Sequence, residues 1–183
     1  IDGLLSFLEE YDRDHGAERN TSAASYDLII QICRSQQHKF YVCYDKSLPR
    51  TRLTGTEPSA PTHECWGRIT NMAKEHTDGR LIVQEFEIRR NNMEELLKSN
   101  GYTNKSTCVA AWRSLGVLNA EDATHPCRSR KIDPTAAKGT SEDVFVLRVF
   151  ADDAAAAEIR AEKKAEELKA AKIRKTIPMR NAK

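Results

Sequence analysis

The stretch at residues 90–118 constrains the fold most, because it has the pattern of two short helices separated by a tight turn. Its first half carries Met93, Leu96 and Leu97 at the i, i+3, i+4 spacing of one buried helical face. The pair Asn100–Gly101 then supplies the residue types that best tolerate positive φ, which is typical of a helix end. Two helices joined by a short glycine-containing turn form a helix-turn-helix unit.

The second half of this stretch predicts a helix capped at its N-terminus by Thr103 or Asn104, since both side chains can accept a backbone N–H. Gly116 is expected to end this helix, and residues 117–118 to leave it as extended chain. Three residues at helical spacing are expected on its buried side: Cys108, Trp112 and Leu115.

The start of the first helix carries the pattern of a capping box. Asn91 is followed three residues later by Glu94, so that each side chain is expected to accept a backbone N–H of the first turn.

Before this unit the sequence predicts two amphipathic helices and three strands. The helices follow from apolar residues that recur every three or four positions, and the strands from β-branched and aromatic residues. In chain order the predicted elements are helices at 3–15 and 23–38, a strand at 39–44, a polar loop at 45–62, and a strand pair at 65–69 and 80–83 around the polar segment 70–79.

After the unit the sequence predicts a basic edge strand at 128–133 and a second strand at 143–150, joined by a turn-rich link at 134–142. A strand before two helices and a hairpin after them is the winged-helix arrangement, with the link as the tip of the wing. The predicted fold is therefore α+β: a winged helix-turn-helix with N-terminal helices, short antiparallel strands and a long C-terminal helix.

The composition changes at Ala151, where a run of strong helix formers begins and continues to Thr176. A heptad pattern fails here, because Glu162 and Lys169 fall at core positions, so a single protruding helix or a docking arm is expected. Three regions result: an N-terminal helix and link at 1–22, an α+β domain at 23–150 and a charged, alanine-rich helical tail at 151–183.

Charge and cysteine content indicate a protein of the reducing cytoplasm. Charged residues make up 31% of the 183 residues, and no apolar run is long enough to span a membrane, so no membrane partner is expected. The five cysteines are scattered, odd in number and contain no CxxC pair. The chain starts with Ile1 rather than Met, which indicates a piece of a longer protein.

The positive charge lies in the two-helix region and in the tail from residue 151, where nine Lys or Arg stand against six Asp or Glu. Residues 89–131 contain eight Lys or Arg and four Asp or Glu, whereas residues 1–88 contain ten and fourteen. A basic patch beside an acidic body is typical of a phosphate-binding face. An ordinary solvated helical surface is the alternative.

If the second helix of the unit buries Trp112, its N-terminus and its outer side are free to contact DNA. Backbone N–H groups and the helix dipole favour a phosphate at that N-terminus, and a basic hairpin adds backbone contacts. The predicted DNA contacts are Asn104, Lys105, Ser106, Arg113, Ser114, Arg128, Arg130 and Lys131. Winged helices also dock proteins, which leaves a protein-binding role open.

No motif for catalysis or nucleotide binding is present, since the sequence contains no Walker A, GxGxxG or GxSxG pattern. Two His-x-Cys pairs raise a zinc hypothesis, because the four ligands are of suitable type. Neither pair has the usual spacing of structural zinc ligands, so no metal and no cofactor is expected. The candidate ligands are His63, Cys65, His125 and Cys127.

Four segments in order carry a family resemblance: SYDLIIQICRSQQHKF, HECWGRI, LLKSNGYTNKSTCVAAWRSLGVL and VFVLRV. They resemble the C-terminal region of AAA+-type DNA helicases of phages and mobile elements, much of which is known only as a domain of unknown function. The resemblance covers residues 23–150 and implies a winged-helix-like unit after an ATPase core. The family's ATP-binding residues have no counterpart here, and the alanine-rich tail departs from its pattern.

The leading hypothesis is a non-catalytic accessory domain of a phage or mobile-element replication helicase that binds duplex or forked DNA. The alternative is a protein-interaction or oligomerisation module of the same kind of assembly, which docks neighbouring subunits through residues 151–175.

Overall fold

The structure, a computed structural model, describes residues 23–53, 56–122, 124–135 and 140–176. The helix expected at residues 3–15 and the middle of the expected wing tip, residues 136–139, lie outside these residues.

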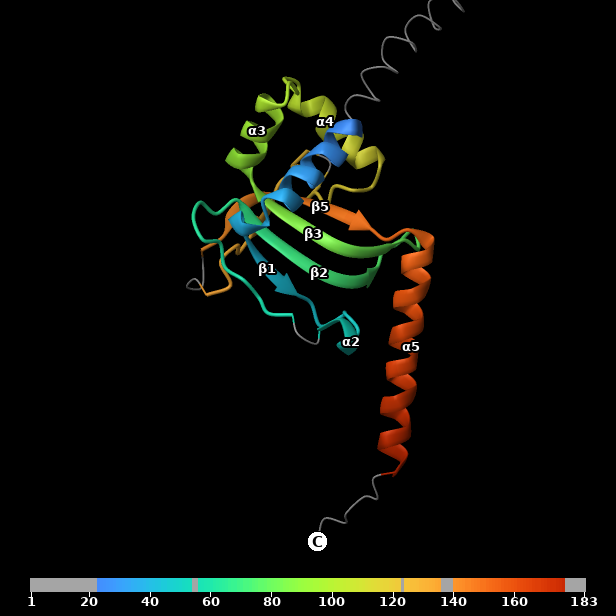
Figure 1. The fold of residues 1–183 in the computed structure, drawn as a ribbon. Coiled ribbons are helices and arrows are strands. Elements are labelled where there is room, and N and C mark those ends of the chain that lie inside the picture. Colours follow the sequence, from blue (N-terminus) through green and yellow to red (C-terminus); the bar gives the residue numbers. More distant parts are fainter. Residues whose placement is uncertain (1–22, 54–55, 123, 136–139, 177–183) are drawn as a thin grey trace, which may run out of the picture.

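A single five-stranded sheet organises the described chain (Figure 1). β1 pairs in parallel with β2, and the other neighbours pair antiparallel. The expectation of short antiparallel strands is therefore wrong in two respects, because one pair is parallel and three strands have nine residues. Across the sheet the order is β1 (Phe40–Tyr44), β2 (Gly67–Glu75), β3 (Leu81–Arg89), β5 (Glu142–Phe150) and β4 (Arg128–Arg130).

Helices cover one face of this sheet. A helix at residues 23–35 lies with α3 and α4 above the strands in Figure 1, and α5 leaves the end of β5 and runs away from the sheet. The other helical elements are the 3₁₀ turn η1 (Gln37–Lys39), α2 (Arg50–Leu53), α3 (Arg90–Ser99), α4 (Lys105–Ser114) and α5 (Asp153–Thr176). The α+β class is confirmed.

The largest core cluster lies between the sheet and the three covering helices. Phe86 and Phe145 point from β3 and β5 toward Met93, Leu97 and Trp112, all of them fully or almost fully buried. The ring of Trp112 meets that of Phe145 edge to face, with centroids 6.4 Å apart. Aromatic pairs in this geometry add stability beyond the apolar area that they bury.

The buried face of the two-helix unit was predicted almost completely. Met93, Leu96, Leu97, Cys108 and Trp112 are buried, as expected.

Leu115 was wrongly expected on that face, since its exposed fraction is 43%. The reason is that α4 ends at Ser114, and Gly116 with a φ of +68° turns the chain so that Val117 enters the core instead.

One predicted cap is present and the other is not. Asn104 caps α4, accepting the backbone N–H of Thr107 at 3.4 Å. The capping box at Asn91 and Glu94 is wrong, because α3 continues directly from β3 and begins at Arg90, which places Asn91 inside the helix.

The strand limits differ from the prediction around the β2–β3 hairpin. Residues 70–75 belong to β2, and the loop predicted there is wrong, because Met72 and Ala73 are buried across a bulge that breaks strict alternation. The helix predicted at 23–38 ends at residue 35, and the edge strand predicted at 128–133 ends at Arg130. The strands at 39–44 and 143–150 and the C-terminal helix are confirmed.

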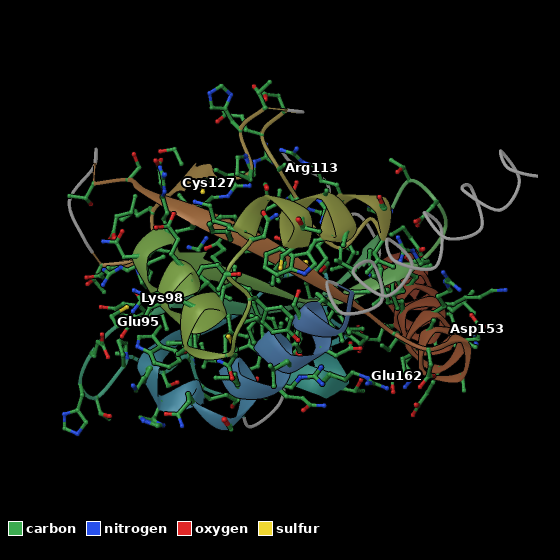
Figure 2. All side chains as sticks on the ribbon, turned by 90° about the horizontal axis from the view of Figure 1, so that it is seen from above. Glu95, Lys98, Arg113, Cys127, Asp153 and Glu162 are labelled. Atoms are coloured by element: carbon green, nitrogen blue, oxygen red, sulfur yellow. The ribbon has the colours of Figure 1, made fainter. Side chains whose placement is uncertain are left out.

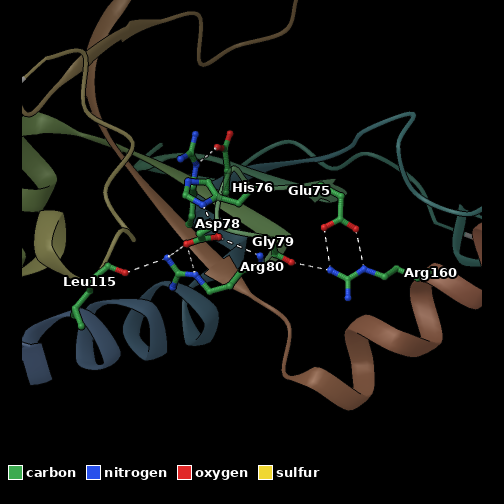
Figure 3. A network of polar contacts seen from close by, with 9 residues as sticks. Glu75, His76, Asp78, Gly79, Arg80, Leu115 and Arg160 are labelled. Atoms are coloured by element: carbon green, nitrogen blue, oxygen red, sulfur yellow. Dashed lines mark hydrogen bonds and ion pairs between the residues drawn. The ribbon is translucent and has the colours of Figure 1, made fainter.

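The tip of the β2–β3 hairpin contacts both α4 and α5 (Figure 3). Arg80 donates from Nη2 to the backbone oxygen of Leu115 at 3.2 Å, directly after α4. Arg160 of α5 donates to the carboxylate of Glu75 at 2.8 Å and to the backbone oxygen of Gly79 at 2.8 Å. The hairpin therefore holds the end of the two-helix unit and the start of the C-terminal helix together.

The first part of α5 is anchored to the rest of the chain, and residues 167–172 are exposed. Ile159 is buried, and Glu162 accepts from Arg52 Nε at 2.8 Å. Residues 167–172 are exposed, with Leu168 at 56%. Docking of a neighbouring subunit through residues 151–175 stays a prediction, and residues 167–172 are the longest exposed run in the described part of that stretch.

A hydrogen bond between Ser25 and Trp112 generates a stability prediction. The indole Nε1 donates to Ser25 Oγ at 3.0 Å, and both residues are fully buried. We expect Ser25→Ala to lower the free energy of unfolding by about 1–3 kcal/mol, because the buried N–H loses its acceptor. Urea unfolding measures this. In the control Ser35→Ala, which removes an exposed hydroxyl, the change should stay within about 0.5 kcal/mol; equal losses would contradict the assignment.

Candidate nucleic-acid interface

The N-termini of α3 and α4 meet at one pocket of about 270 Å³. Arg90 is the first residue of α3 and Lys105 the first residue of α4, and both line this pocket. Each helix N-terminus adds partial positive charge from its unpaired N–H groups. The other lining residues are Glu121, His125, Pro126, Cys127, Asp143 and Phe145.

Glu94 contacts both of the basic residues that begin α3 and α4 in this pocket. Its carboxylate accepts from Lys105 Nζ at 2.6 Å and from Arg90 Nε at 3.1 Å. The hydrogen bond from Lys105 is the main reason why the pKa of Glu94 is lowered. An incoming phosphate would therefore compete with one carboxylate for two cations.

His125 adds charge that depends on pH. Its Nδ1 lies 2.9 Å from a carboxylate oxygen of Asp122, and this hydrogen bond raises the pKa of His125. The pKa of Asp122 is lowered, first by the hydrogen bond from the Thr124 hydroxyl and then by the contacts with His125. The loop that carries these residues thus stabilises the protonated imidazole.

The outer side of α4 consists of small residues. Ser106, Ala110 and Ser114 are exposed at intervals of four positions, and the sequence of α4 contains no acidic residue. Ser106 donates to the side-chain oxygen of Asn104 at 2.6 Å, and Ser114 to the backbone oxygen of Ala110 at 3.1 Å. Small side chains without negative charge leave the helix backbone close to whatever binds it.

Arg113 has a structural contact on this surface. It donates from Nη2 to the backbone oxygen of Asp122 at 3.1 Å and so fixes the loop that follows α4. In Figure 2 Arg113 and Cys127 lie on one side of the two-helix unit, and Glu95 and Lys98 lie along α3 on the other.

The basic residues of β4 lie on the opposite face of the sheet. Arg128 pairs with Val144, and directly paired residues point to the same face. Val144 belongs to a small cluster with Ile132 and Val146, whereas the next residue, Phe145, packs under the helices. The alternation of side chains therefore places Arg128 and Arg130 away from α4.

The structure thus brings together part of the predicted set. Asn104, Lys105 and Ser106 lie side by side at the start of α4, and Arg113 and Ser114 lie at its end. Arg128 and Arg130 occupy the other face, and Lys131 donates to the backbone oxygen of Pro134 at 3.3 Å.

Sequence reasoning missed two residues of the pocket and the fact that they line it together. Arg90 belongs to the first turn of α3. The incorrectly predicted capping box implies a later helix start, and for that reason Arg90 was not recognised as a residue of the helix N-terminus. His125 stands out in the sequence only as a metal ligand. Its contact with Asp122 three residues earlier is a local signal that was available in the sequence.

The four candidate zinc ligands are not gathered in one place. Among the described residues, no group of three or more His, Cys, Asp or Glu is arranged to hold a metal ion. The five cysteines are free thiols, and burial raises the pKa of both Cys65 and Cys127. Nor does the described part of the chain contain a helix long and apolar enough to cross a membrane.

No protein-family model matches the chain, and no curated protein matches it. A solved structure described as "SCCmec type IV Cch - active helicase" is similar at 18% sequence identity with a TM-score of 0.45. The match covers 85% of this chain and 23% of that one, so the chain spans about a quarter of the length of that protein.

Proposed function

We propose that the chain is a non-catalytic accessory domain of a phage or mobile-element replication helicase, and that it binds duplex DNA through α4. The link to helicases rests on the sequence resemblance over residues 23–150. The DNA-binding part rests on the surface around the N-termini of α3 and α4.

In this proposal the unit acts as a winged helix-turn-helix. The order β3, α3, α4, β4, β5 is that of a winged helix, with α4 as the recognition helix and the β4–β5 pair as the wing. The small, acid-free outer side of α4 suits entry into a major groove, where a helix must approach the base edges closely.

The observation that carries the proposal is the convergence of two helix N-termini and two cations on one pocket. Arg90, Lys105 and His125 supply positive charge there, against the carboxylates of Glu121 and Asp143 in the lining. A DNA phosphate in this pocket would accept from backbone N–H groups at the helix start and from Lys105. This contact would position the duplex along α4 but would carry no sequence preference.

Glu94→Gln tests this arrangement directly. The change removes the carboxylate that Arg90 and Lys105 both contact, so we expect duplex DNA to bind several-fold more tightly. The slope of log K against log salt should steepen by about 0.9 for each additional phosphate that the freed cations neutralise. Fluorescence anisotropy with a labelled duplex over a salt series measures both quantities.

The matched control is Glu75→Gln, which removes the same charge from a carboxylate that contacts Arg160 at the other end of the sheet. We expect it to leave the salt slope unchanged. Lys105→Ala should reduce the slope by about 0.9. If Glu94→Gln and Glu75→Gln behave alike and Lys105→Ala has no effect, the pocket is not a DNA contact.

The raised pKa of His125 predicts a pH dependence of binding. Its imidazole is charged below the raised pKa and neutral above it, so DNA affinity should fall as pH rises in the window that starts near the usual value of 6.5 and extends upward. In His125→Gln the affinity should be flat across that window. His63→Gln, on an exposed loop before β2, is the control and should keep the fall. A fall that persists in His125→Gln would contradict this role.

A further inference from the structure

Four arginines gather on the sheet face opposite α3 and α4. Two flanking carboxylates of β3, Glu85 and Glu87, lie among them. We call the four residues the arginine cluster: Arg68 of β2, Arg128 and Arg130 of β4, and Arg148 of β5.

The register of the strands places these side chains on one face. Arg68 is paired with Glu87, and Arg148 with Glu85, so each pair points to the same side of the sheet. Glu87 is also paired with Val146, and Val146 does not belong to the core cluster that packs under the helices. These charges therefore lie on the side that α3 and α4 do not cover.

On this face the carboxylates lie closer to the sheet and the guanidiniums lie closer to solvent. The side chains of Glu87 and Glu85 are only 4% and 16% exposed. Those of the contacting arginines are more exposed: Arg148 20%, Arg68 23% and Arg130 36%. Solvent therefore meets mainly the cations.

Each carboxylate orients arginines from neighbouring strands. Glu87 lies 2.7 Å from Arg68 Nη2 and 3.5 Å from Arg130 Nε. Glu85 accepts from Arg148 Nε at 3.0 Å and, at 3.4 Å, from Asn119, whose side-chain oxygen in turn accepts from Arg128 at 2.7 Å.

Four guanidiniums exceed the two carboxylates that hold them. A guanidinium has five N–H donors in one plane, and a single carboxylate takes at most two of them in a bidentate contact. Donors therefore remain for a further anion, and the planes are already oriented, so less side-chain entropy is lost when that anion binds. The neighbouring pair of Arg89 and Glu142, 2.7 Å apart, leaves this balance unchanged, whereas the carboxylate of Asp133, which contacts Tyr41 opposite Arg68, reduces the excess without removing it.

We propose that the arginine cluster binds the phosphodiester backbone of single-stranded nucleic acid. The excess positive charge suits a repeated anion, and the arginines of three strands present their guanidiniums along one sheet face, where an extended strand can contact them as in sheet-based nucleic-acid modules. The inference rests on the proposed function: α4 would hold the duplex, and a single strand at a fork would pass around the β4 edge to the opposite face.

The test compares binding of the full chain to a labelled 20-nucleotide oligo(dT) and to a duplex of 20 base pairs. For Arg68→Gln/Arg130→Gln we expect about tenfold weaker binding of oligo(dT) and a salt slope lower by about 1.4, since two phosphate contacts are lost. Duplex affinity should not change. The matched control, Arg34→Gln/Arg160→Gln, removes two arginines outside this face and should not alter oligo(dT) binding.

Loss of Arg68 leaves the buried Glu87 without its closest cation, which can destabilise the fold. Arg130→Gln removes only the longer contact, and it should weaken oligo(dT) binding several-fold while thermal unfolding stays as in the parent chain.

The inference is overturned if folded cluster variants bind oligo(dT) like the parent chain, and also if polyglutamate binds the cluster as tightly as oligo(dT), because the ligand would then be an acidic protein segment. In the first case Lys105→Ala still decides the proposed function, since it acts on duplex binding. Failure of one contact surface is thus distinguishable from failure of the other.

Discussion

The burial of Trp112 is the interaction on which the rest of the structure depends. Its ring packs edge to face on Phe145 of the central sheet, and its N–H donates to Ser25 of the helix at residues 23–35. This one side chain joins α4 to both neighbouring layers. Because an α-helix has a fixed angular spacing, fixing Trp112 inward also fixes which residues of α4 point outward and where its N-terminus lies. The candidate interface follows from that core contact.

The spacing of apolar residues in the sequence predicted those helices and strands that depend on residues close together in the chain. The two helices of the unit, the strand at 143–150 and the C-terminal helix follow from periodicity and residue propensity, and Asn104, which caps α4, was one of the two caps predicted. Features set by pairing between distant strands were not predictable in this way. The parallel β1–β2 pair and the face occupied by Arg128 and Arg130 depend on strand register, which a single sequence does not contain.

On both basic surfaces of the molecule, carboxylates contact the basic side chains. Glu94 holds Arg90 and Lys105 at the helix N-termini, and Glu85 and Glu87 hold arginines on the opposite face. In each case a carboxylate orients cations and offsets part of their charge. A phosphate must therefore displace or share an existing partner, which favours moderate affinity with strong salt dependence over tight permanent binding. Such contacts would suit the DNA-binding role that is proposed for this chain.

Amide hydrogen exchange of the chain with and without duplex DNA tests the central claim, that the start of α4 faces DNA, most directly. The account predicts slower exchange at residues 104–108 and in the loop around His125 when duplex is added, with little change in α5. Slower exchange confined to residues 167–172 of α5, with α4 unchanged, would contradict it, because the DNA contact would then lie on the C-terminal helix.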